Sequence, residues 1–141
     1  MRESVNVPVK KFTLSRNERL KSRTLINRLF SEGKTMQQFP FHMYYLFVPE
    51  SEEHLKAGFG VSSRHFRKAV DRNRIKRLTR EAYRLQSPDL KNGISAANKK
   101  LVLFFIYTGK ELPEQDLITK KMKLILQRLS NIINEDPVAS A

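Results

Sequence analysis

The stretch from Lys56 to Leu85, KAGFGVSSRHFRKAVDRNRIKRLTREAYRL, decides how this chain of 141 residues is organised. From Lys68 onward it has no Gly or Pro and is rich in Arg, Lys, Leu and Ala, which predicts a helix. At about 100° per residue, one side of this helix collects Ile75, Leu78, Ala82 and Leu85. The other side collects Arg72, Asn73, Lys76, Arg77, Arg80 and Arg84. We therefore expect one face against a core and a cationic face against a ligand.

The cationic face carries more charge than the helix itself can neutralise. From Arg64 to Arg84 there are nine Lys and Arg residues against two acids, Asp71 and Glu81, which is a net charge of +7. Such runs usually form solvated faces held by i,i+4 ion pairs. Nine cations cannot pair with two anions, and like charges at i,i+4 cost roughly 0.2–0.5 kcal/mol per pair. The pattern therefore favours a nucleic-acid partner over a merely solvated face.

The same residues match a family pattern, in which a strand ending in Val-Ser and basic residues precede A-V-x-R-N-R-I-K-R-x-x-R-E. Here the pattern is present as Gly60-Val61-Ser62, Ala69–Arg77 and Arg80-Glu81. The chain thus resembles the bacterial ribonuclease P protein component. It departs from the pattern at Ser63, where a lysine is usual, and at Phe66-Arg67-Lys68, which replaces a glycine-containing turn.

Composition limits the class of protein. The formal charge of +13 and a pI near 10.3 indicate a polyanionic partner, and the length suits one domain over residues 1–141. The longest apolar run, Leu101–Tyr107, is too short to span a bilayer. The chain has no Cys, and Met1–Lys11 does not resemble a signal peptide. We expect a cytoplasmic protein with mobile ends at residues 1–11 and 136–141.

A short helix with its own basic cluster is predicted near the start. Ser22 suits the N-cap position and Gly33 the C-terminal stop. The apolar face consists of Leu25, Ile26, Leu29 and Phe30. The basic cluster consists of Arg16, Arg19, Lys21, Arg23 and Arg28.

Two strands are predicted next. Phe39–Val48 is aromatic and contains no Gly, and Pro40 places it at a strand start or a sheet edge. One of its faces holds Phe39, Phe41, Met43, Tyr45 and Phe47, and the other holds Pro40, His42, Tyr44 and Leu46. An acidic turn, Pro49–His54, leads to a second strand at Lys56–Ser62. We expect these two strands to form an antiparallel hairpin.

The last third predicts a strand and a helix. Ser87-Pro88 should end the basic helix, and Asn92–Asn98 should form a loop. Lys100–Tyr107 is apolar on both faces and should be a buried central strand. Pro113 should open a final helix in its first turn. The core stripe of that helix should comprise Leu117, Ile118, Met122, Ile125, Leu126, Leu129 and Ile133.

These elements predict an α+β protein, a two-layer sandwich. The family resemblance implies the order αβββαβα, with one more short strand near Thr35–Gln37 and a mixed sheet of about four strands. It also implies a left-handed βαβ crossover, as in domain 2 of ribosomal protein S5. Strand physics alone would favour a right-handed crossover.

No constellation of side chains suggests that the protein itself is the catalyst. The acids Glu50, Glu52 and Glu53 fall in a predicted turn, where solvated carboxylates are the simpler interpretation. The three histidines, His42, His54 and His65, have no metal-ligand spacing. Ser62 and Ser63 have no identifiable base partner.

The resemblance supplies a chemistry instead. It implies a ribozyme whose RNA subunit cleaves the 5′ leader from precursor tRNA, with Mg²⁺ held by the RNA and the substrate phosphates. The protein would screen phosphate repulsion, hold the single-stranded leader in a groove and broaden the substrate range. We expect one protein per RNA, no DNA and no membrane.

The resemblance also implies two sets of binding residues. Those for the catalytic RNA are Arg64, Arg67, Lys68, Arg72, Asn73, Arg74, Lys76, Arg77, Arg80 and Arg84. Those for the leader are Phe30, at an aromatic position of the family, and strand aromatics among Phe39, Phe41 and Tyr45. Core packing remains the alternative for each of these rings.

Two other classes share the charge pattern. A basic structural RNA-binding protein of the ribosomal type would have the same surface but no effect on a ribozyme. A DNA reader would need a short recognition helix and usually a dimer seam, and no such seam is evident. Co-purification of a structured RNA of several hundred nucleotides would favour the ribozyme subunit.

Overall fold

The computed structural model describes residues 18–135, so both predicted mobile ends and Arg16 lie outside the described residues. The elements follow in the order αβββαβα, and the short first strand is present. They are α2 (Arg23–Glu32), β1 (Lys34–Gln38), β2 (Phe41–Phe47), β3 (Leu55–Val61), α3 (Ala69–Ala96), β4 (Leu101–Tyr107) and α4 (Gln115–Glu135).

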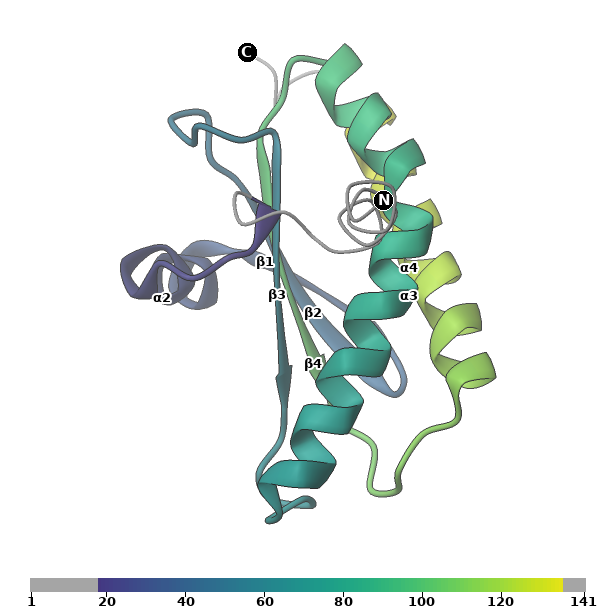
Figure 1. The fold of residues 1–141 in the computed structure, drawn as a ribbon. Helices are drawn as coiled ribbons and strands as arrows, with labels where there is room; N and C mark the ends of the chain where they lie inside the picture. The colour runs from purple at the N-terminus through teal and green to yellow at the C-terminus, as the bar shows by residue number, and fades with distance from the viewer. Residues whose placement is uncertain (1–17, 136–141) are drawn as a thin grey trace, which may run out of the picture.

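The four strands form one mixed sheet in the order β1-β2-β4-β3 (Figure 1). β4 pairs antiparallel with β2 and parallel with β3. The predicted hairpin of β2 with β3 is therefore wrong, because β4 lies between them. The hairpin is formed by β1 and β2, with its turn at Phe39-Pro40. A strand that is apolar on both faces buries both of them only in the interior of a sheet.

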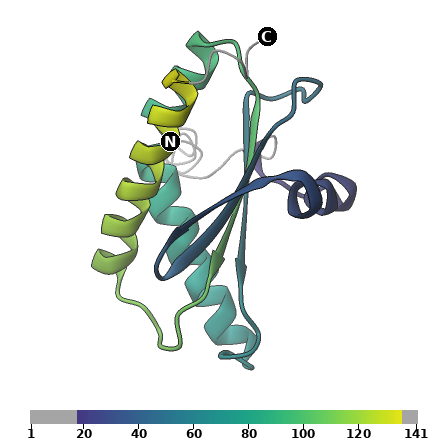
Figure 2. The same cartoon turned by 180° about the vertical axis from the view of Figure 1, so that it is seen from behind.

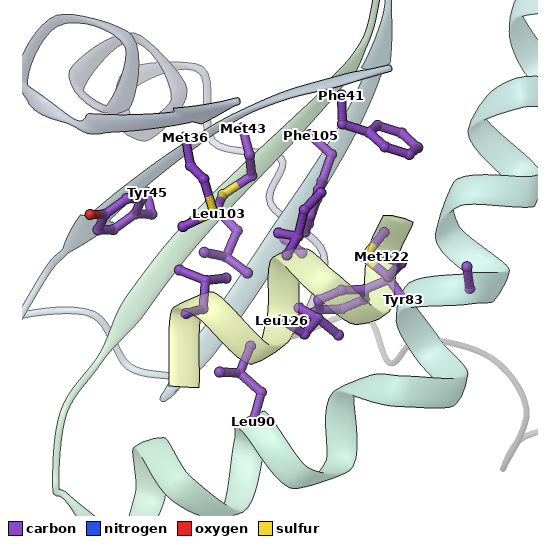
Figure 3. Packing of buried hydrophobic residues seen from close by; sticks show 14 of the residues in the cluster. Met36, Phe41, Met43, Tyr45, Tyr83, Leu90, Leu103, Phe105, Met122 and Leu126 are labelled. Atoms are coloured by element: carbon purple, nitrogen blue, oxygen red, sulfur yellow. The ribbon is translucent and has the colours of Figure 1, made fainter. Parts of the chain in front are cut away.

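The helices cover the two faces of the sheet unequally. α3 and α4 form a layer on one face, and α2 lies alone on the other (Figures 1 and 2). The main core fills the space beneath α3 and α4, where Figure 3 shows Phe41, Met43 and Phe105 of the sheet facing Met122 and Leu126. A smaller cluster of Leu20, Leu29, Val48 and Val102 lies beneath α2. One sheet face thus carries most of the core, and the other is only partly covered.

The first helix forms as its sequence predicts. The Ser22 Oγ accepts a hydrogen bond from the Leu25 amide at 3.2 Å, and Gly33 ends the helix. Leu29 is fully buried, whereas Phe30 keeps 42% of its surface exposed. α2 therefore presents an aromatic ring at its margin instead of burying it.

The basic helix continues past Ser87-Pro88, so its predicted end there is wrong, and so is the loop at Asn92–Asn98. Pro88 has no N–H for the Arg84 carbonyl, but the Ser87 hydroxyl donates to that oxygen at 3.4 Å. The helix ends at Ala96, and Asn98 adopts a left-handed φ of 56°. A single side-chain hydrogen bond thus replaces the missing backbone bond.

Two helix-face predictions also fail. Leu85 is exposed, because the buried stripe of α3 is centred on Thr79, Tyr83 and Leu90. In α4, Leu117 is exposed, although the other six predicted core residues are buried. Pro113 precedes the first helical residue, Gln115, by two positions. Within the described residues, no helix combines the length and apolarity that a bilayer crossing requires.

Two glycines provide a test of this packing. A Cβ at Gly58 of β3 would lie 2.7 Å from Cδ2 of the Phe104 ring, whereas a Cβ at Gly93 of α3 would meet nothing within 4 Å. Gly58→Ala should lower the free energy of unfolding by about 1–3 kcal/mol through overpacking. Gly93→Ala, the matched control, should raise it by roughly 0.5–1 kcal/mol. Urea denaturation measures both, and equal effects would contradict the close packing of Phe104 on β3.

Candidate nucleic-acid interface

The N-terminal half of α3 and the segment before it carry exposed cations. The exposed residues of the predicted set are Arg64, Arg67, Lys68, Asn73, Arg74 and Arg77, whereas Lys76 is half-buried. The ion pairs of the described chain join Arg28 to Glu32 and Glu50, Arg84 to Glu81, and Lys91 to Glu18. None of the five exposed cations of this set takes part in them. Their charge is therefore available to an external anion.

Arg72 has a different role in the free protein. Its Nη1 donates to the carbonyl oxygens of Phe66 and Arg67, at 2.8 and 2.7 Å. The N-cap residue Lys68 makes no side-chain capping bond. Arg72 therefore ties the loop before the helix to its first turn, and it only partly faces solvent.

Arg84 and Arg80 are also held by the protein. Arg84 pairs with Glu81, and its side chain is only 13% exposed, so the structure does not present it as a surface contact for RNA. Arg80 lies over the Phe59 ring, 5.8 Å from the ring centroid. Burial, followed by the nearby charge of Arg19, lowers the pKa of the Arg80 guanidinium. The side chains of these two arginines pack against other groups of the protein, whereas the exposed cations face solvent.

The described part of the second basic cluster, from Arg19 to Arg28, lies beside β3 and on α2. The segment before α2 runs along the edge of β3, where the Leu20 amide donates to the Ala57 oxygen at 3.0 Å. Arg28 is bound by Glu50 and Glu32, and hydrogen bonding to Glu50 raises the Arg28 pKa and lowers that of Glu50. Arg19, Lys21 and Arg23 remain exposed.

The predicted leader residues do not come together. Phe41 and Tyr45 are 1% and 7% exposed and belong to the core beneath α3 and α4 (Figure 3), so their assignment to an open surface is wrong. Phe39 is 72% exposed, but it lies in the β1–β2 turn beside Leu112 and Leu117. Of the four predicted leader residues, only Phe30 lies on the α2 side of the sheet.

Phe30 instead meets rings that sequence reasoning missed. Its ring centroid lies 4.8 Å from that of Tyr44 and 5.3 Å from that of Phe104. The His42 ring follows at 5.0 Å from Tyr44. We call Phe30, His42, Tyr44 and Phe104 the aromatic cluster. It joins α2, β2 and β4 on the sheet face that the long helices leave uncovered.

A signal for this cluster was present in β3. Gly58 and Gly60 lie two residues apart and therefore on the same face. The Phe104 ring lies close over both, so a Cβ at Gly60 would be 3.0 Å from its Cε1. Two glycines on one strand face indicate the close approach of a bulky group from a neighbouring strand.

The acidic and histidine residues do not converge. Among the described residues, no three His, Cys, Asp or Glu side chains form a group that could hold a metal ion. His54 Nδ1 contacts the Lys99 carbonyl oxygen at 2.8 Å, His42 belongs to the aromatic cluster, and His65 is exposed. We therefore assign no metal site to these side chains.

The fold and its two surfaces define a class: a basic α+β protein suited to a ligand that carries both phosphates and bases. The ribonuclease P family model matches residues 14–130. The ribonuclease P protein component of Porphyromonas gingivalis is 34% identical over 120 residues, which cover 84% of this chain and 88% of that protein. That of Caldanaerobacter subterraneus subsp. tengcongensis is 34% identical over 103 residues, covering 73% and 79%.

Solved structures agree on the fold. The RNase P protein of Staphylococcus aureus superposes with a TM-score of 0.65 at 20% identity, covering 79% of this chain and 94% of that one. The protein from Thermotoga maritima gives 0.60 at 24% identity, covering 79% and 96%. The chain belongs to the ribonuclease P protein family, and its role is that of the protein component. This assignment favours a ribonuclease P component over the ribosomal-type and DNA-reading alternatives.

The two kinds of arginine on α3 predict different effects on stability. Arg72→Ala removes both hydrogen bonds to the preceding loop and should lower the free energy of unfolding by about 1–2 kcal/mol. Arg74→Ala, an exposed control on the same helix, should change it by less than about 0.5 kcal/mol. Denaturation without RNA measures both, and equal losses would rule out the anchoring role of Arg72.

Proposed function

We propose that this chain is the RNA-binding subunit of ribonuclease P, which binds the catalytic RNA and the single-stranded 5′ leader of precursor tRNA. In this role it assists the endonucleolytic removal of the leader and broadens the range of substrates. One observation carries the proposal. Exposed cations without acid partners lie on and just before α3, and a partly exposed aromatic cluster lies on the α2 side of the sheet.

The exposed cations support the assignment to the catalytic RNA. Arginine donates to phosphate through a planar fork, and lysine acts as a point charge. Lys68 at the N-cap of α3 and Arg74 and Arg77 on its first turns are exposed, so a folded RNA can approach them from solvent. Bound phosphates would also relieve the repulsion among these cations.

The aromatic cluster supports the assignment to the leader. An unpaired base stacks on an aromatic ring whatever its sequence, which suits an enzyme that accepts many tRNAs. Phe30 is the most exposed large ring of the cluster, and Tyr44 and Phe104 hold it in place from the sheet. The leader would therefore lie on the face opposite α3 and α4.

Magnesium would act on the RNA side of this complex. The described residues offer no ligand group of their own for a metal ion, so the RNA and the substrate phosphates would hold Mg²⁺. The contribution of the protein is then electrostatic and positional. One protein per catalytic RNA and a cytoplasmic location complete the proposal.

Removal of exposed cations tests the RNA surface. Replacing Lys68, Arg74 and Arg77 with Ala should weaken binding to the catalytic RNA. It should also reduce the slope of log K against log salt by about 0.7–0.9 for each phosphate that the variant no longer neutralises. Binding titrations across a salt series measure this.

A charge-matched control separates direct binding from net charge. Lys110, Lys120 and Lys123 are exposed cations beside and on α4. Replacing these three with Ala changes the net charge equally and should leave the slope nearly unchanged. Equal slopes for the two triple variants would refute the proposal that Lys68, Arg74 and Arg77 contact the catalytic RNA directly.

Removal of the Phe30 ring tests the leader surface. Phe30→Ala should cost about 1–3 kcal/mol of holoenzyme affinity for precursor tRNA, while mature tRNA without a leader binds as before. Its effect on stability should stay small for a ring that is 42% exposed, about 0.5–1.5 kcal/mol from the missing ring–ring interactions.

Phe39→Ala is the matched aromatic control, because Phe39 is exposed but lies outside the aromatic cluster. It should leave the affinity for precursor tRNA unchanged. A reduction in Phe30→Ala that is the same with and without the leader would contradict stacking and indicate a structural role.

A further inference from the structure

His42 is the ring of the aromatic cluster that carries nitrogen atoms. It lies on β2 opposite Gln37 of β1 and Ile106 of β4, on the same sheet face as Tyr44. Its ring is inclined by only 31° to that of Tyr44 at a centroid distance of 5.0 Å. The aromatic surface around Phe30 and Tyr44 therefore extends to an imidazole, whose ring edge can hydrogen-bond.

The hydrogen-bonding state of this ring follows from its neighbour. The Gln37 amide nitrogen lies 3.1 Å from His42 Nδ1. An amide nitrogen only donates, so Nδ1 accepts and the ring hydrogen is on Nε2. His42 Nε2 thus has a hydrogen to donate.

Within residues 18–135 that donor has no acceptor. Nε2 is buried and has no hydrogen-bond partner among the residues that the structure describes. A buried donor left unpaired costs about 1–3 kcal/mol, and such groups in native proteins usually have a bound water or a functional partner. The ring as a whole is only partly buried, so a ligand that inserts beside Tyr44 and displaces the covering side chains reaches this edge.

We propose that His42 is a specificity-determining residue for the leader: its Nε2–H donates to an acceptor atom of a leader base that enters the aromatic cluster. The inference rests on the proposed leader site and adds a preference to it. Stacking on Phe30 and Tyr44 accepts every base, whereas a directed N–H bond selects bases by where they present an acceptor. One leader position would then be read, and the others only stacked.

The test uses the holoenzyme with the full chain and precursor tRNAs whose leader is changed one position at a time to each of the four bases. With wild-type protein, affinities at one position should differ by about 3- to 10-fold, the value of one hydrogen bond. His42→Leu keeps the bulk of the side chain and should abolish that difference. His42→Gln, which keeps an N–H donor, should restore part of it. Thr119→Val, at an exposed position of α4 on the other side of the sheet, is the control and should change nothing.

A second measurement does not depend on a folded variant. In the full chain with ¹⁵N-labelled histidine, a short single-stranded RNA carrying the preferred base should shift the Nε2 resonance of His42, and the same RNA with the least preferred base should not. A base preference that survives His42→Leu, no preference at any position, or an unmoved Nε2 resonance overturns the inference. If Phe30→Ala also shows no leader-selective effect, the leader site itself fails. If Phe30→Ala does show one, only the role of His42 fails.

Discussion

The central position of β4 is the constraint on which the rest of the structure depends. Both neighbours of Leu101–Tyr107 satisfy its backbone, and its side chains serve opposite faces in alternation. Phe105 stacks on Phe59 beneath the long helices, whereas Phe104 meets Phe30 on the other face. At a sheet edge this strand would lose one ladder of hydrogen bonds and expose apolar surface. The core and the aromatic cluster are thus coupled through one strand.

The arginines of α3 form one run in the sequence, but in the structure some are bound by other groups of the protein and others are exposed. Arg72 and Arg84 are engaged by backbone oxygens and by Glu81, so they stabilise the scaffold. Arg74 and Arg77 are exposed and take no part in the ion pairs of the described chain. Helical periodicity places Arg72, Arg77 and Arg84 on the same polar side of the helix. Periodicity cannot tell which of these three arginines is already held by the preceding loop or by a neighbouring acid.

Sequence signals within a few residues of each other predicted most elements. The errors arose where the structure depends on contacts between residues that are distant in the sequence. Ser22 and Gly33 bound α2 because caps act within a few residues. The pairing of β2 with β3 failed because the strand between them, β4, follows about forty residues later in the chain. Pro88 does not end α3, since the Ser87 hydroxyl serves the orphaned carbonyl. Consecutive strands are neighbours only about two-thirds of the time, so sequence order was a weak guide here.

The leader residues illustrate the same limit on a single strand. Alternation along β2 separates Phe41 and Tyr45 from His42 and Tyr44, but both sets are aromatic and either could face the core. The choice is made by α4, whose buried stripe covers the Phe41 side. The one local sign of the outcome lies in β3, where Gly58 leaves room for Phe104. The Phe104 ring packs on the backbone of Gly58 and contacts Phe30, and no helix buries it completely. For this reason the α2 side of the sheet keeps a partly exposed aromatic surface.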